Sequence, residues 1–399
     1  MKRSRGGMET TDDVVSVPSN AFELPGRAAW LGPWVEFGAP VYSDTTRGVS
    51  VRTRLHRALI GGATLAALVA MWALTAAPAS ASAWGGAYTP GRYIPIGVPG
   101  FTNSTLAFNV NEFGVVTGLY SPTPPLPSSG LVGFVEIDGK YTSIADPALP
   151  TGTNIGLFNV TFSGEVLGGY TPPDGVSYAL SDVNGKLTTL YDPNADYTDS
   201  TPFGGPGTSV WGSSMTGEIT GYYPDKTASH TNHGFVYADG HWRTVDCPAG
   251  HGYVGSALFY VGDYGREMLA LCWTANFATF DSYIYTPDRT FSSAPANFTQ
   301  LPTPPGPYAA NGEYQYNFVN DFGLAGGDEV VANPKPSNGC GETVQDAFVY
   351  ENGQFTTIPP RAGLCIASAR GANDRGVLAL DEFNSTASAS DSFLLTPGF

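Results

Sequence analysis

The stretch Phe108-Asn-Val-Asn-Glu-Phe-Gly-Val-Val-Thr-Gly-Leu-Tyr120 decides the fold, because it recurs along the chain. Close copies are Phe158-Asn-Val-Thr-Phe-Ser-Gly-Glu-Val-Leu-Gly-Gly-Tyr170 and Trp211-Gly-Ser-Ser-Met-Thr-Gly-Glu-Ile-Thr-Gly-Tyr-Tyr223. Weaker copies centre on Gly265, Gly323 and Gly376. Successive turn glycines are 48 to 58 residues apart. A period of this length is typical of architectures in which each repeat is one small sheet. The sequence thus contains six units.

Each unit has a second half built around an Asp-Gly or Asn-Gly pair. The pairs are Asp138-Gly139, Asn184-Gly185, Asp239-Gly240 and Asn352-Gly353. Such pairs adopt the positive φ angles of a tight hairpin turn. In the first half, Asn111, Asn320 and Asn373 stand three residues before the turn glycine. There the Asn side chain can close an Asx-turn while Gly takes the left-handed conformation. Each unit therefore predicts two hairpins, or four strands.

Six units of four short antiparallel strands predict an all-β fold, a six-bladed β-propeller. The last unit ends at its third strand, Ser392–Pro397, with no fourth strand after it. The segment Arg92–Gly100 matches the fourth strand of the fifth unit, Gln354–Ala362. We expect this N-terminal strand to complete the last blade, which would close the ring and pair a free sheet edge. Residues 92–399 then form one domain, preceded by a linker at 84–91.

Two aromatic positions recur in the units and predict core between blades. The first holds Phe108, Phe158, Trp211 and Phe259, and the second holds Tyr141, Trp242, Phe291 and Phe355.

Composition agrees with a turn-rich β protein. The chain has 50 Gly and 32 Pro among 399 residues, with 42% hydrophobic and 13% aromatic residues, enough for a core. Residues 84–399 hold 11 Lys and Arg against 29 Asp and Glu, a net charge of −18. Nucleic acids and anionic membranes need clustered positive charge, so neither is expected as a partner.

The N-terminal region predicts export. Arg52, Arg54 and Arg57 precede an uncharged stretch, 58–77, which ends in the small residues Ala79–Ala83. A basic segment, an apolar segment and an Ala-x-Ala site form a secretory signal peptide, here residues 51–83. A retained membrane anchor is the alternative. Residues 1–50 show no repeat, and we expect an unstructured extension or a start site placed too early.

Four cysteines, Cys247, Cys272, Cys340 and Cys365, follow the predicted signal. An even number fits disulfides in an oxidising compartment. Local bridges Cys247–Cys272 and Cys340–Cys365 are one of three possible pairings, and free buried thiols are the alternative.

The units resemble the HAF repeats of probable extracellular proteins, which have Asn-x-x-Gly-x-Val-x-Gly-Tyr, then Gly-Phe, a Gly turn and Phe-Thr-Thr-Ile-Asp-x-Pro. The resemblance covers most of residues 92–399. It is strongest in units one to three and weakest in unit four, where Leu269 and Leu271 replace the Gly118 and Tyr120 of unit one. It implies a secreted protein and carries over no catalytic residue.

Few residues suggest chemistry. The predicted mature part has four histidines, His230, His233, His241 and His251, without the spacing of a zinc site and without a Gly-x-Ser-x-Gly elbow. Asp146, Asp192 and Asp246 occupy equivalent strand ends, where a carboxylate bonds the following turn. We therefore predict no catalytic residue, no metal ligand and no cofactor.

Loops of variable length are left as the place for specificity. They are 121–130, 196–208, 225–233, 300–314 and 332–343, and the candidate binding residues are Tyr197, Tyr308, Tyr314 and Tyr316. We expect a secreted, extracellular and monomeric binding module for a glycan or a surface protein, free of the membrane after signal cleavage. The alternatives are an extracellular carbohydrate-active enzyme that uses rim carboxylates, and a structural surface protein.

Overall fold

The computed structural model describes residues 87–123, 130–198, 205–227, 231–275, 280–306, 314–334, 340, 342–384 and 390–398. These residues form 24 strands and a short 3-10 turn at Pro295–Asn297, so the predicted all-β fold is confirmed. The predicted N-terminal extension and signal peptide lie outside the described residues. Among the residues that are described, no helix is long and apolar enough to cross a membrane.

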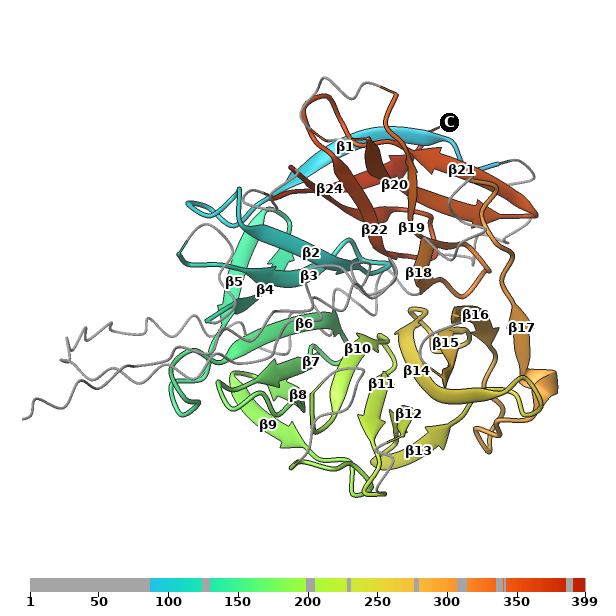
Figure 1. Ribbon diagram of the computed structural model, residues 1–399. Coiled ribbons are helices and arrows are strands. Elements are labelled where there is room, and N and C mark those ends of the chain that lie inside the picture. Colours follow the sequence, from blue (N-terminus) through green and yellow to red (C-terminus); the bar gives the residue numbers. More distant parts are fainter. Residues whose placement is uncertain are drawn as a thin grey trace, which may run out of the picture.

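Sixteen strands form four four-stranded antiparallel sheets, which are blades of a β-propeller arranged around a centre (Figure 1). The first blade holds β2 (Thr105–Val110), β3 (Val116–Tyr120), β4 (Val132–Ile137) and β5 (Lys140–Ile144). The second holds β6 (Asn154–Val160), β7 (Val166–Thr171), β8 (Tyr178–Val183) and β9 (Lys186–Leu190). The third holds β10 (Ser209–Ser213), β11 (Ile219–Pro224), β12 (Asn232–Ala238) and β13 (His241–Val245). The fourth holds β14 (Tyr253–Val261), β15 (Met268–Thr274), β16 (Phe280–Tyr285) and β17 (Phe298–Gln300).

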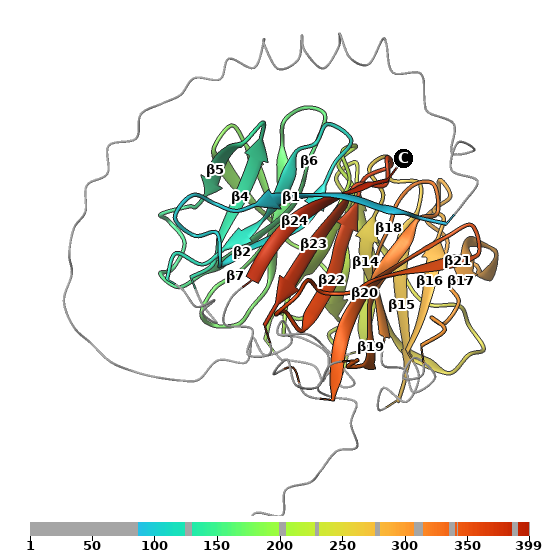
Figure 2. The same ribbon diagram turned by 90° about the horizontal axis from the view of Figure 1, so that it is seen from above.

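The other eight strands form one continuous sheet. They are β18 (Tyr314–Val319), β19 (Ala325–Ala332), β20 (Thr343–Glu351), β21 (Gln354–Ile358), β22 (Ile366–Ala372), β23 (Leu378–Phe383), β24 (Ser390–Pro397) and β1 (Pro90–Ile96). Strands β20 and β22 are joined through one parallel residue pair, Gln345 and Ile366. Strand β1 lies antiparallel to β24, blue beside red in Figures 1 and 2.

Packing at the N-terminal end begins before the predicted domain boundary at Arg92. Tyr88 is buried, and its hydroxyl lies 3.1 Å from the carbonyl oxygen of Gly376 and 3.3 Å from that of Leu395. Part of the predicted linker is therefore packed against the eight-stranded sheet.

The turns have the predicted chemistry. Asp138, Asn184, Asp239 and Asn352 all have φ between 51° and 55°, and each is followed by a glycine that also has positive φ. In the first hairpin of a unit, Asn111 Oδ1 accepts hydrogen bonds from the amides of Phe113 and Val115, at 3.0 and 3.1 Å. Asn320 and Asn373 do the same in their own turns. The Asx-turn and hairpin predictions are confirmed.

The first strand of each repeat unit, which we call its inner strand, carries a β-bulge at the same place. These strands are β2, β6, β10, β14, β18 and β22. The bulged residues are Phe108, Phe158, Trp211, Phe259, Asn317 and Arg370. Opposite the first bulge, a Cβ on Gly118 would lie 2.0 Å from the carbonyl oxygen of Leu106. The glycine of the Val-x-Gly-Tyr motif is therefore fixed by this close strand approach.

A tyrosine two residues after this glycine joins the second strand of a blade to its fourth. The hydroxyls of Tyr120, Tyr170 and Tyr223 lie 3.0, 2.8 and 2.7 Å from the hydroxyls of Ser143, Thr189 and Thr244. The tyrosine of the second strand and the Ser or Thr of the fourth strand thus recur together in the repeat because their hydroxyls bond each other.

The first aromatic position lies between blades as predicted. Phe108 stacks on Phe158 at 5.3 Å and Trp211 stacks on Phe259 at 4.5 Å between ring centroids. At the second position, the aromatic residues contact a Phe of their own blade. These pairs are Tyr141 with Phe134, Trp242 with Phe235, and Phe355 with Phe348.

Unit four departs from the predicted alignment. The amide of Gly262 bonds the carbonyl of Glu267, one residue further along than the equivalent bond from Asn111 to Val115. Because of this inserted residue, Ala270 and Cys272 occupy the Gly and Tyr positions of the motif, not Leu269 and Leu271. The fourth strand begins at Phe298, so the predicted equivalence of Phe291 is wrong. Phe291 instead lies outside the strands, under the guanidinium of Arg243.

Both predicted disulfides are present, Cys247–Cys272 and Cys340–Cys365, each spanning 25 residues. The first joins the end of β13 to β15 of the next blade. The second joins the connection before β20 to the residue before β22. Each bridge therefore links sheet segments that are not neighbours in one hairpin, and no free cysteine is present in the described chain.

The six inner turns are joined in a closed circle of hydrogen bonds, which we call the turn ring. It comprises the turns that follow β2, β6, β10, β14, β18 and β22. The contacts, in order, are Asn111 Nδ2 to Asn159 Oδ1, Phe162 N to Met215 O, Met215 N to Asp263 O, Arg266 N to Asp321 Oδ1, Asn320 Nδ2 to Asn373 O and Asn373 Nδ2 to Asn111 O.

Candidate functional site

The strand order gives the propeller two different faces. In an antiparallel blade, the turn after the first strand and the turn after the third lie at the same end. This end, the turn face, carries the turn ring and the Asp-Gly hairpins. The opposite end, the loop face, carries the connections after the second and fourth strands. All five loops predicted to vary in length belong to these connections. Because binding residues concentrate on loops held by a rigid scaffold, the loop face is the first candidate for a binding site.

Three tyrosines of the second blade pack together at the loop face. Tyr178 begins β8, Tyr191 follows β9, and Tyr197 lies in the connection to β10. The ring of Tyr178 stacks on that of Tyr197 at 5.7 Å and meets Tyr191 edge-on at 5.5 Å, with Tyr191 and Tyr197 5.9 Å apart. Tyr191 is 57% exposed. We call these three residues the tyrosine platform.

Hydrogen bonds and packing hold the platform in place. The Tyr197 hydroxyl lies 2.8 Å from the hydroxyl of Thr208, and Tyr170 stacks under Tyr178 at 5.1 Å. Burial raises the pKa of Tyr178, and the neighbouring carboxylate of Asp174 raises it further. Asp174 is exposed, so the platform offers aromatic surface with a hydrogen-bond acceptor beside it.

The third blade places an imidazole and a carboxylate at the positions equivalent to Tyr178 and Tyr191. His233 and Asp246 occupy them, with His233 Nδ1 2.6 Å from Asp246 Oδ1 and Nε2 3.4 Å from Asp225 Oδ2. The predicted equivalence of Asp246 with Asp146 and Asp192 is therefore wrong, because Asp246 lies one position earlier after its strand. The hydrogen bond to Asp246 is the main cause that raises the pKa of His233, and the ring stacks on Tyr223. The two positions that hold Tyr178 and Tyr191 in the second blade thus hold a hydrogen-bonded imidazole and carboxylate in the third.

His233, Asp246 and Ser256 are hydrogen-bonded in an order that differs from that of a hydrolase triad. Ser256 Oγ donates to Asp246 at 3.4 Å and accepts from the Gly234 amide at 2.9 Å. In a Ser-His-Asp triad the histidine stands between the other two residues. Here Asp246 stands between them, so the serine hydroxyl donates to a carboxylate and not to the imidazole.

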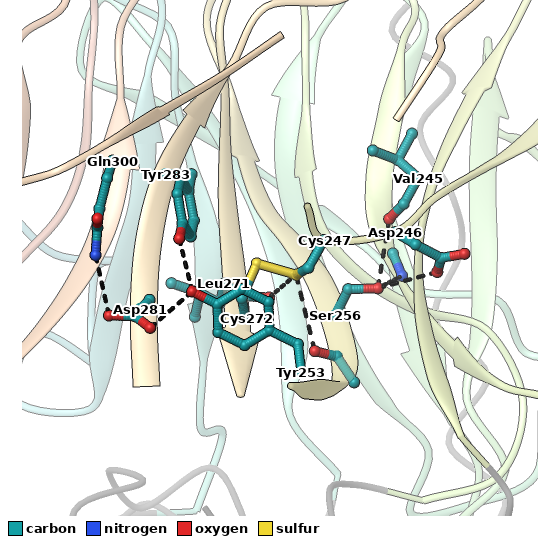
Figure 3. The surroundings of a disulfide bond; sticks show 12 residues. Val245, Asp246, Cys247, Tyr253, Ser256, Leu271, Cys272, Asp281, Tyr283 and Gln300 are labelled. Atoms are coloured by element: carbon teal, nitrogen blue, oxygen red, sulfur yellow. Dashed lines mark hydrogen bonds between the residues drawn. A yellow bond between two sulfur atoms is a disulfide. The ribbon is translucent and has the colours of Figure 1, made fainter. Parts of the chain in front are cut away.

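Figure 3 shows what lies beside the first disulfide on this face. Ser256 and Asp246 are on one side of the Cys247–Cys272 bridge. On the other, Tyr253 donates to Asp281 at 2.8 Å and lies 2.6 Å from the Tyr283 hydroxyl. These polar groups bond one another, which stabilises the strand ends at the fourth blade.

Three of the four predicted binding tyrosines lie within the described residues, and they differ in exposure. Tyr197 is part of the platform. Tyr314 is partly buried, with its hydroxyl 3.4 Å from that of Thr303. Tyr316 is fully buried and donates to the carbonyl of Pro302 at 2.7 Å, so its ring is not available to a ligand. Tyr308 lies outside the described residues. The rings of Tyr314 and Tyr316 meet edge-on at 6.2 Å, whereas Tyr197 belongs to the tyrosine platform of the second blade.

Sequence reasoning missed Tyr178 and Tyr191. Both belong to strand ends, not to the variable loops on which that reasoning concentrated. The signal was nevertheless present, because the equivalent positions in unit one are Val132 and Ala145. A unit that places exposed aromatics where its neighbour has small apolar residues departs from the scaffold pattern.

A cavity of about 400 Å³ lies between β1, β24 and the side chain of Tyr141. Its main charged group is Arg361, which is paired with Glu382 and Asp391 and stacks on the ring of Phe393 at 3.8 Å. Because these charges already satisfy one another, the cavity offers a ligand little free hydrogen-bonding capacity.

Comparison with known proteins gives no family. No family model matches the chain, and no curated protein matches it. Among solved structures, AofleA from Arthrobotrys oligospora is 11% identical, with 77% of this chain and 86% of that chain covered and a TM-score of 0.41. TolB from Acinetobacter baumannii is 8% identical over 72% and 65%, with a TM-score of 0.41. The Aleuria aurantia lectin in complex with α-methyl-L-fucoside is 8% identical over 76% and 97%, with a TM-score of 0.37. No inference about ligand follows from similarities this low.

Proposed function

We propose that this chain is a secreted six-bladed β-propeller with HAF-like repeats, which binds a glycan at the tyrosine platform. The six-blade count divides the eight-stranded sheet into two blades, whose strands pair with each other at only one residue pair in the described chain. Two observations support this division: both halves repeat the inner-strand bulge, and both repeat the Asx-turn. In this reading β1 is the fourth strand of the final blade.

Export is supported by the two disulfides, since structural bridges persist in oxidising compartments. The signal-peptide pattern of residues 51–83 agrees with it.

The glycan assignment rests on one observation, the exposed and packed tyrosine platform. An aromatic face is electron-rich and attracts the partly positive C–H groups on one side of a sugar ring. Tyr191 gives such a surface at little entropic cost, because packing against Tyr178 and Tyr197 already restricts its ring. The exposed carboxylate of Asp174 can accept hydrogen bonds from sugar hydroxyls. Rings without a polar neighbour would favour an apolar ligand, so this combination favours a glycan.

The test is binding of the purified protein to a panel of glycans and polysaccharides, with each well also assayed for newly released sugar ends. We expect binding without release, weakened about tenfold or more by Tyr191→Ala, as truncation of a central aromatic anchor does. The matched control is Tyr264→Ala, because Tyr264 is also an exposed tyrosine but lies on the turn face.

Three results would contradict the proposal. Release of sugar ends would make the protein a carbohydrate-active enzyme. Equal loss in both variants would show that Tyr191 contributes through stability alone. Absence of binding to the whole panel would favour a protein partner or a structural role.

A further inference from the structure

The turn face has a site of its own at the centre of the turn ring, unrelated to the glycan proposal. Four of the six inner turns carry a carboxylate at their second residue: Glu112, Asp263, Asp321 and Asp374. A fifth carboxylate, Glu267, closes the turn of unit four. The sequence separates the four turn carboxylates by more than 50 positions from one to the next, and only the ring brings them together.

Four of these five carboxylates have one buried oxygen without a hydrogen-bond partner among the described residues, whereas both oxygens of Asp321 accept backbone amides. Asp263 is 3% exposed; its Oδ1 accepts from Asn159 Nδ2 at 3.3 Å, while its Oδ2 has no partner. Glu112 Oε1 and Asp374 Oδ2 are buried and without a partner as well. An ionised carboxylate buried with an unsatisfied oxygen is costly, so each such oxygen is a place for a donor that the protein itself does not supply.

The negative charge exceeds the positive charge around this centre. Glu112 is paired with Arg375 at 3.0 Å, and Arg266 lies over the ring of Tyr264 at 5.6 Å. Two guanidinium groups thus stand against five carboxylates. Burial and the charges of Asp374 and Glu112 raise the pKa of Asp263 well above its usual range. Burial, together with Asp321 and Glu112, raises the pKa of Asp374 to about 7.

Exposed aromatic rings surround the same centre. Phe113, Phe162 and Tyr264 are 47%, 37% and 40% exposed, and neighbouring rings in this row are 5.9 Å apart. Phe322 is a further exposed ring, in the turn after β18. The charges of Glu112, Asp374 and Asp263 all act on the Tyr264 hydroxyl, so these rings and the carboxylates share one location.

The floor beneath is closed by Tyr260. Its hydroxyl reaches from β14 to Asn109 Oδ1 of β2 and lies 3.4 Å from the carbonyl of Ala372 in β22. The Tyr260 hydroxyl thus links β2, β14 and β22 next to the turn ring.

We propose that the centre of the turn ring binds an alkylammonium group. Aromatic faces attract a cation through the ring quadrupole, and carboxylates accept charge-assisted hydrogen bonds from its N–H groups. An ammonium carries three donors in one compact group, and a partnerless oxygen of Glu112, Asp263 or Asp374 can accept one of them. A metal ion fits less well, because no three acidic, His or Cys side chains in the described residues are placed to hold one. The ammonium can come from a small amine or from a lysine side chain.

The experiment is calorimetric titration of the purified protein in borate buffer at about pH 8 or acetate buffer at about pH 5; neither contains an amine, and both keep millimolar calcium in solution. The probes are n-hexylammonium, the neutral isostere n-hexanol, calcium chloride and a short acetylated peptide with one lysine. At about pH 8 we expect hexylammonium to bind at least about tenfold more tightly than hexanol. Tighter binding of the peptide or of the small amine would identify the source, and either result supports the site.

Variants separate the two parts of the site. Asp374→Asn keeps the shape and removes one charge, and Phe162→Ala removes one ring. We expect each to weaken hexylammonium binding about threefold to thirtyfold. Tyr191→Ala on the loop face should leave it unchanged. Lowering the pH to about 5 should weaken binding, because the carboxyl of Asp374, whose pKa is about 7, then takes up a proton. The charges that face Asp374 are those of Asp321, Glu112, Asp263 and Arg266.

Other outcomes would overturn the proposal. Equal binding of hexanol would reduce the site to an apolar patch, and a response to calcium alone would make it a metal site. If no cation binds at millimolar concentration, the carboxylates are held neutral by protons and the ring centre is structural. None of these results bears on glycan binding at the opposite face.

Discussion

Replacing Asp374 by Asn should stabilise the protein, and increasingly so as pH rises. The pKa of this carboxyl is raised from 3.8 to about 7, mainly by burial and then by the charge of Asp321. An acid whose pKa is higher in the folded than in the unfolded state favours folding at low pH. That advantage is lost as pH rises from about 4 to about 7. Three units at about 1.4 kcal/mol each give a cost of up to about 4 kcal/mol for the ionised side chain.

In the parent protein, Asp374 Oδ1 accepts a hydrogen bond from the Asp321 amide at 2.9 Å. The side-chain oxygen of Asn at position 374 can accept the same bond. The variant and the parent should therefore be equally stable near pH 4 and differ by up to about 4 kcal/mol near pH 8. Urea unfolding of both proteins at about pH 4, 6 and 8 in phosphate and citrate buffers measures this difference. Comparing the two proteins cancels the other raised carboxyls, among them Asp381 and Asp346, both with pKa about 6.

The control is Asp239→Asn, an exposed hairpin residue at φ 52°, where other units already have Asn. Its stability should match that of the parent at every pH. A variant Asp374→Asn that is less stable than the parent, or whose difference from it does not grow with pH, would refute the assignment of a buried, repelled carboxylate at the ring centre.

Three further predictions concern the scaffold. Deleting Pro90–Ile96 should lower the melting temperature of the whole domain by about 10 °C or more, because it exposes an edge of β24; unchanged melting would contradict closure by this strand. Gly118→Ala should cost about 3 kcal/mol or more in urea unfolding, since the new Cβ would lie 2.0 Å from the Leu106 carbonyl oxygen, and a cost below about 1 kcal/mol would show that the strands can separate freely. Replacing Cys247 and Cys272 by Ser should cost about 3 kcal/mol, as expected for opening a loop of 25 residues, and an equally stable variant would mean that the bridge adds nothing to folding.

Local sequence rules predicted the local structure well. The Asx-turn at Asn111 and the hairpin at Asp138 depend on the conformational preferences of a few adjacent residues, so sequence alone identifies them. The two disulfides were predicted as one of three pairings. Alignment by the turn glycine failed in unit four, because one inserted residue at the turn shifts every later position by one. The residue equivalent to Gly118 is therefore Ala270 and not Leu269.

The candidate sites were less accessible to sequence reasoning. Tyr316 and Tyr197 were both predicted to bind because each is a tyrosine in or near a variable loop. Tyr316 is nevertheless fully buried, while Tyr197 is only partly buried. Which of the two is exposed depends on how a connection folds over the strand end, and no local pattern encodes that. The carboxylates of the turn ring could not be recognised as a group, because their proximity is a property of the ring and not of any one unit.

The closed turn ring also determines how the molecule can come apart. In a linear array of repeats, the end units have one neighbour and fray first, so local opening is frequent there. Here each inner turn is bonded to the turns on both sides, and Asn373 and Asn111 join the last turn to the first. Opening any one unit therefore breaks two sets of contacts, and no unit is a weak terminus from which opening could spread. We expect the amides of all six inner strands to exchange with solvent together, at rates governed by global unfolding and not by the position of a strand along the chain.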